Sequence, residues 1–171
     1  KLGARKGIYK GVEDEDRMGG FLPHCTFNLQ PRAASIDTPV HGFVPFTHVE
    51  HMHPDAIIAI AASKNSRELT AEIFGDEIGW LPWRRPGFQL GLDLETFVKS
   101  NPNAKGVVLE SHGLFTWAND AKDCYELTLA IINKAIEWLD KKGEGKAAFG
   151  GSSSEERRAG EEGRCRGSPE H

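Results

Sequence analysis

The stretch T-H-V-E-H-M-H-P-D-A-I-I-A-I-A-A, residues 47–62, holds the passage from a strand to a helix and decides the fold. Polar and apolar residues alternate over 47–53, which predicts a short strand. Pro54 suits the first turn of a helix, and the apolar run that follows it predicts a helix over 56–62. His51 and His53 are two residues apart, so on a strand both imidazoles lie on one face. Side chains at the end of a strand project from a rigid scaffold, a position at which functional residues are often found.

A second histidine follows another strand signal about sixty residues later. The run K-G-V-V-L-E, residues 105–110, predicts a buried strand, and residues 114–117 predict its antiparallel return. His112 lies between them, beside Gly113, which permits close approach of another backbone. Three histidine ligands with a free fourth position are typical of catalytic zinc, so the histidines 51, 53 and 112 predict a metal site. The alternative is that they are unrelated polar residues near the surface.

The remaining pattern favours an α/β layered domain. Helices are expected over 66–74, 92–99 and 120–142, the last with Asn119 as its N-cap, and a further strand over 77–83. Strands and helices alternate, and one hairpin is expected at the third histidine, so a mixed sheet is favoured over a purely parallel one. The acidic run at residues 13–16 is interpreted as a solvated face.

Composition limits the classes of protein that fit. The chain has 171 residues, 39% of them hydrophobic, which suits one domain over 1–142 followed by a linker or tail over 143–171 that contains no Val, Ile, Leu or Met. A net charge of −4 gives no basic surface for nucleic acid, and no apolar run approaches the roughly 20 residues of a membrane span. The three cysteines, Cys25, Cys124 and Cys165, are odd in number and form no metal-type pair, as expected of a reduced cytoplasmic protein.

A metal-dependent lyase also needs a base, and the residues alone leave two candidates. Glu110 precedes His112 by two positions and could share its face. Asp37 lies in the segment S-I-D-T-P, residues 35–39, which also has the pattern of an ordinary helix start. Glu50 alternates away from the histidine pair. His41 could donate a hydrogen bond to a group that binds the metal, although a packing role is favoured for it.

Several segments together resemble the class II aldolase/adducin family. They are P-H-C-T-F (23–27), P-R-A-A-S-I-D-T-P (31–39), H-P-D-A-I-I-A-I-A-A-S (53–63), G-W-L-P-W-R-R-P-G-F (79–88) and S-H-G-L-F-T-W (111–117). The resemblance covers about two-thirds of the chain. The matching part of the chain most resembles the aldolase domain of bacterial fusion proteins that join rhamnulose-1-phosphate aldolase to a short-chain alcohol dehydrogenase.

The resemblance implies a three-layer α/β/α domain with a central mixed, largely antiparallel sheet. It implies aldol cleavage of a ketose 1-phosphate. In rhamnose catabolism this substrate is rhamnulose 1-phosphate, and the products are dihydroxyacetone phosphate and lactaldehyde. The cofactor is then Zn²⁺ or another divalent metal, held by His51, His53 and His112. Asp37 falls where the family carries a glutamate after a serine, and Ser35 where neighbouring residues bind phosphate.

The family also implies a homo-oligomer, in many members a tetramer, and a dehydrogenase fused to this domain in the full-length product. Related members catalyse epimerisation or decarboxylation through an enediolate, and adducin-like members serve as interaction modules without catalysis. The latter typically lack the metal histidines, which this chain retains.

Two departures from the family pattern are visible. Its phosphate loop, which lies upstream of the metal histidines, has no counterpart here, so the N-terminal part of the domain is expected to be incomplete. Its frequent tyrosine acid aligns with Trp83, whose indole has no acidic phenol proton. Arg84 and Arg85 follow, and they either contact phosphate, in this or a neighbouring subunit's site, or form a solvated turn.

Overall fold

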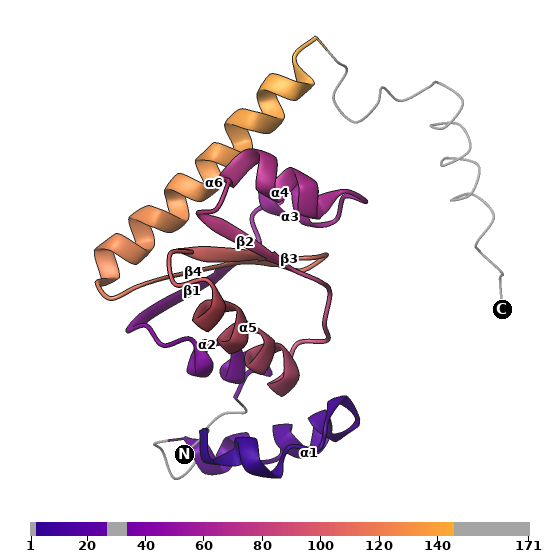
Figure 1. Ribbon diagram of the computed structural model, residues 1–171, viewed down its shortest axis with the longest axis vertical. Helices are drawn as coiled ribbons and strands as arrows, with labels where there is room; N and C mark the ends of the chain where they lie inside the picture. The colour runs from indigo at the N-terminus through magenta and orange to yellow at the C-terminus, as the bar shows by residue number, and fades with distance from the viewer. Residues whose placement is uncertain (1–2, 27–33, 146–171) are drawn as a thin grey trace, which may run out of the picture. The chain divides into compact units, whose positions relative to one another are not determined.

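A computed structural model describes residues 3–26 and 34–145, and its centre is a four-stranded mixed sheet (Figure 1). The strand order is β1-β4-β3-β2. The strands β1 and β4 are antiparallel, as are β4 and β3, whereas β3 and β2 are parallel. The strand bounds are β1 His48–Met52, β2 Ile78–Leu81, β3 Gly106–Leu109 and β4 Gly113–Ala118.

Helices cover both faces of this sheet, which confirms the predicted three-layer α/β/α class (Figure 1). One face packs against α2, Thr38–Phe43, and α5, Phe88–Ser100. Their side chains Val40, Leu90 and Leu94 are buried with Phe115 and Trp117 of β4. The other face carries α3, Asp55–Ala61, α4, Ser66–Phe74, and the part of α6, Ala121–Gly143, that ends at Ile136.

The strand-to-helix passage at residues 47–62 forms as predicted, with β1 followed directly by α3. The burial of Ile57, Ile60 and Ala61, each 0% exposed, fixes α3 against the sheet. Full burial of an isoleucine side chain contributes about 1.5–3 kcal/mol, so Ile57 and Ile60 hold α3 in place and with it the histidines that precede the helix.

The long helix α6 begins at Ala121, one residue after the predicted start at 120. The backbone N–H groups of Lys122 and Asp123 donate to Asp120 Oδ1, so Asp120 caps the helix and the prediction of Asn119 was wrong. The expected buried stripe is present, at Cys124, Thr128, Ile131 and Ala135. The described chain divides within α6, into a unit that ends at Ile136 and another that begins at Glu137.

Four short elements precede the sheet: η1 Gly3–Ile8, η2 Val12–Asp14, α1 Glu15–Gly19 and η3 Leu22–Cys25. Most of the predicted tail, residues 146–171, lies outside the described residues. Within the described part, no helix combines the length and apolar character that a membrane span requires.

The interpretation of residues 13–16 as a solvated face was wrong for Glu15, which is 7% exposed. Its carboxylate accepts the backbone N–H groups of Phe88 and Gln89, both at 2.7 Å, and the Tyr9 hydroxyl. These are the first N–H groups of α5, which have no partner within the helix, and an acidic group is favourable there. This distant cap, together with buried Phe88, explains why α5 begins four residues before the predicted start at 92.

Candidate metal centre

His51 is held at the end of β1 with one ring nitrogen committed to the backbone. Its Nδ1 lies 3.0 Å from the carbonyl oxygen of Leu114 on β4. Because a carbonyl can only accept, Nδ1 carries the proton and Nε2 carries the lone pair. A backbone carbonyl that fixes the tautomer in this way is the usual second partner of a metal-binding histidine.

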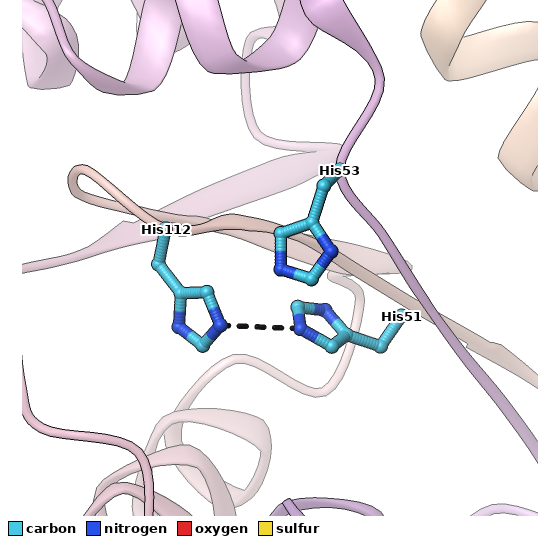
Figure 2. Close-up of side chains that lie close together, drawn as sticks. All are labelled: His51, His53 and His112. Atoms are coloured by element: carbon cyan, nitrogen blue, oxygen red, sulfur yellow. Dashed lines mark hydrogen bonds between the residues drawn. The ribbon is translucent and has the colours of Figure 1, made fainter.

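The other two predicted ligands converge on His51. His51 Nε2 lies 3.2 Å from His112 Nε2, and one ligand nitrogen from each of His51, His53 and His112 lies within 4.8 Å of the others. Figure 2 shows the three rings pointing toward one another from the end of β1 and from the β3–β4 turn. His53 is exposed and the other two are half-buried, so the cluster is accessible from one side.

Gly113 and Phe115 explain how the two strands approach so closely. A Cβ atom on Gly113 would lie 2.8 Å from the carbonyl oxygen of Met52 and 2.9 Å from Cδ2 of His53, so a side chain there would displace the cluster. Phe115 stacks on the ring of His51, with centroids 4.0 Å apart and planes 10° apart. The glycine therefore makes room for the second strand, and the phenyl ring supports the first ligand.

Burial favours the neutral form of His51 and His112. It lowers the pKa of His51 to about 4, an effect that positive charge on His53 or His112 would reinforce, while the Leu114 carbonyl and Asp37 act in the opposite direction. Burial and His53 also lower the pKa of His112, again opposed by Asp37. A metal ligand must be unprotonated, so at neutral pH both rings are in the state that binds metal.

The donor set fits a divalent transition metal. For tetrahedral zinc with Zn–N bonds of about 2.0–2.1 Å, ligand nitrogens lie about 3.4 Å apart. The 3.2 Å separation of His51 and His112 already matches that spacing. Three imidazoles favour zinc and related first-row metals over magnesium or calcium, which prefer oxygen ligands.

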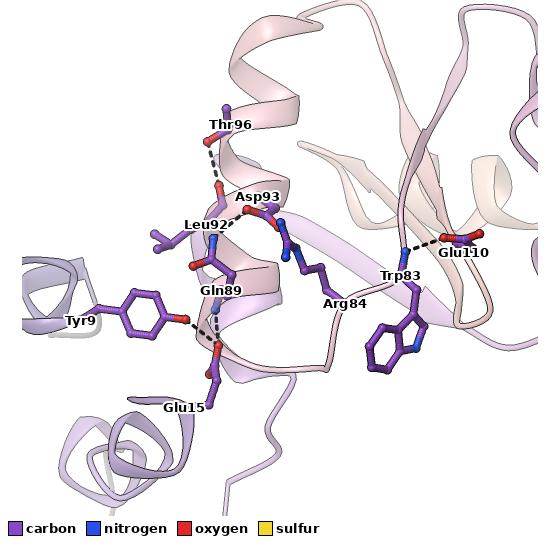
Figure 3. A network of polar contacts seen from close by, with 9 residues as sticks. All are labelled: Tyr9, Glu15, Trp83, Arg84, Gln89, Leu92, Asp93, Thr96 and Glu110. Atoms are coloured by element: carbon purple, nitrogen blue, oxygen red, sulfur yellow. Dashed lines mark hydrogen bonds and ion pairs between the residues drawn. The ribbon is translucent and has the colours of Figure 1, made fainter. Parts of the chain in front are cut away.

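The structure distinguishes between the two candidate bases. The Glu110 carboxylate accepts the backbone N–H of Trp83 at 2.9 Å, so it links two turns (Figure 3). Asp37 Oδ1 is buried and, with His112 Nδ1, is one of two such side-chain atoms without a hydrogen-bond partner in the described chain. Its charge acts on both His51 and His112. Asp37 is therefore the carboxylate that acts on the histidines and keeps one oxygen without a hydrogen-bond partner.

Asp37 opens onto a cleft of about 540 Å³ beside the histidine cluster. Asp37, the N-cap of α2, and His41 within the helix are four residues apart, so both side chains lie on the face of α2 that lines the cleft. The ring of His41 lies 6.3 Å from that of His51 and edge-on to Phe115, at 5.3 Å. His41 therefore packs against Phe115, as favoured, and it also lines the cleft. The lining residues are Ser35, Asp37, Thr38, His41, Gly42 and His51.

The residues predicted to contact phosphate lie in two different environments. Ser35 lines the cleft, and its hydroxyl accepts the backbone N–H of Asp37 at 3.1 Å. Arg84 pairs with Asp93 at 2.8 Å, as Figure 3 shows, and Arg85 pairs with Asp16 at 2.6 Å. Both guanidinium groups are thus engaged by carboxylates of their own chain.

Comparison with known proteins identifies the class to which this fold and histidine cluster belong. Residues 15–138 match the family described as the Class II Aldolase and Adducin N-terminal domain. The match spans well over half of the chain, so the protein belongs to this family.

Individual relatives agree with that assignment. The chain is 36% identical over 137 residues to the protein named "Uncharacterized oxidoreductase YuxG" of Bacillus subtilis; the match covers 80% of this chain and 20% of that protein. The structure of the N-terminal class II aldolase domain of a conserved Thermoplasma acidophilum protein superposes with a TM-score of 0.71 and 28% identity, over 81% of this chain and 62% of that one. An aldolase II superfamily protein from Pseudomonas syringae shares the fold, with a TM-score of 0.53 and 16% identity, over 83% and 60% of the two chains.

Proposed function

We propose that this domain carries out metal-dependent aldol cleavage of a ketose 1-phosphate, with rhamnulose 1-phosphate as the first substrate to test. The observation that carries the proposal is the convergence of His51, His53 and His112 beside the unpartnered carboxylate oxygen of Asp37. Three nitrogen ligands, an open side and an adjacent base are the features that this reaction requires. The products are dihydroxyacetone phosphate and lactaldehyde.

The three histidines hold the metal, and zinc is the proposed ion. When bound, a divalent metal supplies Lewis-acid polarisation of the substrate's carbonyl and hydroxyl oxygens. The Leu114 carbonyl keeps the proton of His51 on Nδ1, so that Nε2 faces the site. The low pKa of His51 and His112 keeps protons off the ligand nitrogens at neutral pH.

Asp37 acts as the base in this proposal. Its free oxygen takes the proton of the C4 hydroxyl, the C3–C4 bond breaks, and the aldehyde leaves with C4 as its carbonyl carbon. The electron pair of the broken bond remains on the three-carbon fragment as an enediolate, which takes up a proton at C3 to give dihydroxyacetone phosphate.

Phosphate recognition is assigned to the same cleft. Ser35 lies two residues before Asp37 and lines the cleft, so its hydroxyl is placed to contact a substrate oxygen. Arg84 and Arg85 remain proposed phosphate contacts. For either to bind substrate, its guanidinium must exchange a carboxylate of Asp93 or Asp16 for the phosphate.

Metal content and product release test the proposal together. The purified protein should hold close to one equivalent of zinc, and it should release dihydroxyacetone phosphate from rhamnulose 1-phosphate, detected by coupled reduction with glycerol-3-phosphate dehydrogenase. A chelator should stop the release, and added zinc should restore it. Metal binding without release from any of a panel of ketose 1-phosphates would favour epimerase or decarboxylase chemistry. Absence of metal would favour the non-catalytic, adducin-like alternative.

The whole protein is proposed to be larger than this domain. The chain spans only a fifth of its Bacillus subtilis relative, whose name is that of an oxidoreductase. A dehydrogenase fused to this domain would use the aldehyde that the aldolase releases. We propose a cytoplasmic homo-oligomer for the full-length product, and light scattering of the full-length protein tests its oligomeric state.

A further inference from the structure

The turn between β3 and β4 holds its central residue in a backbone conformation that side chains rarely adopt. Ser111 has φ of +52°, and it is the one non-glycine residue with positive φ in the part of the chain that the structure describes. For an L-residue this left-handed conformation crowds Cβ against the following carbonyl. Ser111 directly precedes His112, so the strained peptide lies at the base of a proposed metal ligand.

Three hydrogen bonds hold the turn in place. The N–H of His112 donates to the Leu109 carbonyl at 3.1 Å, which closes the turn on itself. The N–H of Glu110 donates to Leu81 at 2.9 Å, and the N–H of Ser111 donates to Ala61 at 2.9 Å. Rotation of Ser111 into an ordinary backbone conformation would disrupt this arrangement, so the surrounding structure determines its φ.

The bond to Ala61 links the two halves of the histidine cluster. Ala61 is the last residue of α3, is fully buried, and belongs to a helix that begins two residues after His53. A continuous path therefore runs from His53 through α3 to the carbonyl of Ala61, across one hydrogen bond to Ser111, and on to His112. The helix sets the separation between ligands that are almost sixty residues apart in the sequence.

The backbone of Ser111, rather than its hydroxyl, carries this role. The side chain is exposed, and its hydroxyl forms no hydrogen bond within the described residues. We infer that Ser111 is a positioning residue for metal binding: its left-handed backbone, held by the carbonyl of Ala61, directs Nε2 of His112 toward His51. The inference rests on the proposed metal site and adds the element that orders its third ligand.

A series of substitutions at position 111 tests the inference through metal affinity, with Co²⁺ as the probe. Affinity is measured on the full chain by titration followed in visible absorption, and Zn²⁺ competition then gives the zinc affinity. Gly and Asn tolerate the left-handed conformation, so Ser111→Gly and Ser111→Asn should bind Co²⁺ within about threefold of the original chain. Ser111→Ala should do the same, because it removes only the hydroxyl.

Branched side chains should have the opposite effect. Val at a left-handed position is a severe backbone outlier, so Ser111→Val should weaken Co²⁺ binding by at least about tenfold. The matched control is Ser100→Val, which makes the same replacement at an exposed serine with negative φ on α5 and should leave the affinity unchanged. Circular dichroism of the metal-free proteins establishes that each variant is folded. Ser111→Thr serves as a milder second variant should the valine protein fail to fold, and it too should bind more weakly than Ser111→Ala.

The possible failures are distinguishable. If the original chain binds no Co²⁺ through its histidines, the proposed function fails and the inference fails with it. If the original chain binds Co²⁺ and the folded valine or threonine variant binds equally well, only the inference is overturned. A loss of affinity in Ser111→Ala as large as that in the branched variants would also overturn it, because the hydroxyl would then be responsible.

Discussion

The histidine end of the sheet and the turn at residues 84–87 both carry polar side chains predicted to serve one reaction. They differ in whether those side chains already have partners within the chain. At the sheet end, Asp37 Oδ1 and His112 Nδ1 are buried and unpartnered. In the turn, Arg84 and Arg85 already pair with Asp93 and Asp16. A buried polar atom without a partner is costly unless a ligand satisfies it, whereas a paired surface charge is stable without one. The contrast favours the sheet end as the place of the proposed chemistry, whereas a phosphate contact by the turn would require its ion pairs to break.

The largest test of this contrast is removal of a ligand that the fold orients. His51→Ala removes the ring whose tautomer is fixed by Leu114, and we expect stoichiometric zinc binding to be lost, measured by calorimetry and metal analysis. His48→Ala is the matched control, because His48 lies three residues earlier on β1 and faces away from His51. Equal zinc binding by both variants would show that the histidine cluster is not the metal site.

The second test concerns the two carboxylates near the cluster. Asp37→Asn keeps the size of the side chain but removes its basicity, so we expect kcat for dihydroxyacetone phosphate release to fall by roughly 10²–10⁴-fold while zinc is retained. Glu110→Gln is the control; its amide oxygen can still accept the N–H of Trp83, and we expect little change in kcat. A larger loss in the Glu110 variant would reverse the assignment of the base.

The sequence predicted that His51, His53 and His112 converge, because the spacing of the first two is local. His51 lies on β1 and His53 directly follows its end, so their short separation places both at one strand end, and Gly113 marks the close approach of the second strand. The choice between Asp37 and Glu110 could not be made in this way, because it depends on how α2 packs on the sheet. Glu15 was misjudged for the same reason: its partners Phe88 and Gln89 lie 73 and 74 residues away.

The third test uses the pH dependence of folding of the metal-free protein. Burial lowers the pKa of His51 from 6.5 to about 4, so between these values the unfolded chain binds more protons than the folded one. Stability should therefore be full above about pH 6.5 and decline as the pH falls toward 4. Because the ring is only partly buried, we expect this residue to account for about 1–2 kcal/mol of that decline.

Denaturant unfolding at a series of pH values measures this effect. His51→Gln removes the titrating group, so its free energy of unfolding should vary less between pH 6.5 and 4 than that of the original chain. His48→Gln is the control and should retain the full dependence. An unchanged slope in the His51 variant would assign the acid sensitivity to other groups.

The smallest effects are expected in the arginine turn. Arg84→Ala and Arg85→Ala each remove an exposed ion pair, so each should lower the free energy of unfolding by no more than about 1 kcal/mol. If the turn is structural, KM for the phosphorylated substrate should change by less than about tenfold, which corresponds to 1.4 kcal/mol.

The alternative, that the turn binds phosphate, makes a distinct prediction, because an arginine that binds phosphate must first leave its carboxylate. In that case Asp93→Asn or Asp16→Asn would free the guanidinium and lower KM, while the matching alanine variant would raise it. Opposite shifts within one pair would therefore show that the turn belongs to the substrate site, and no shift in either variant would confine the chemistry to the histidine end of the sheet.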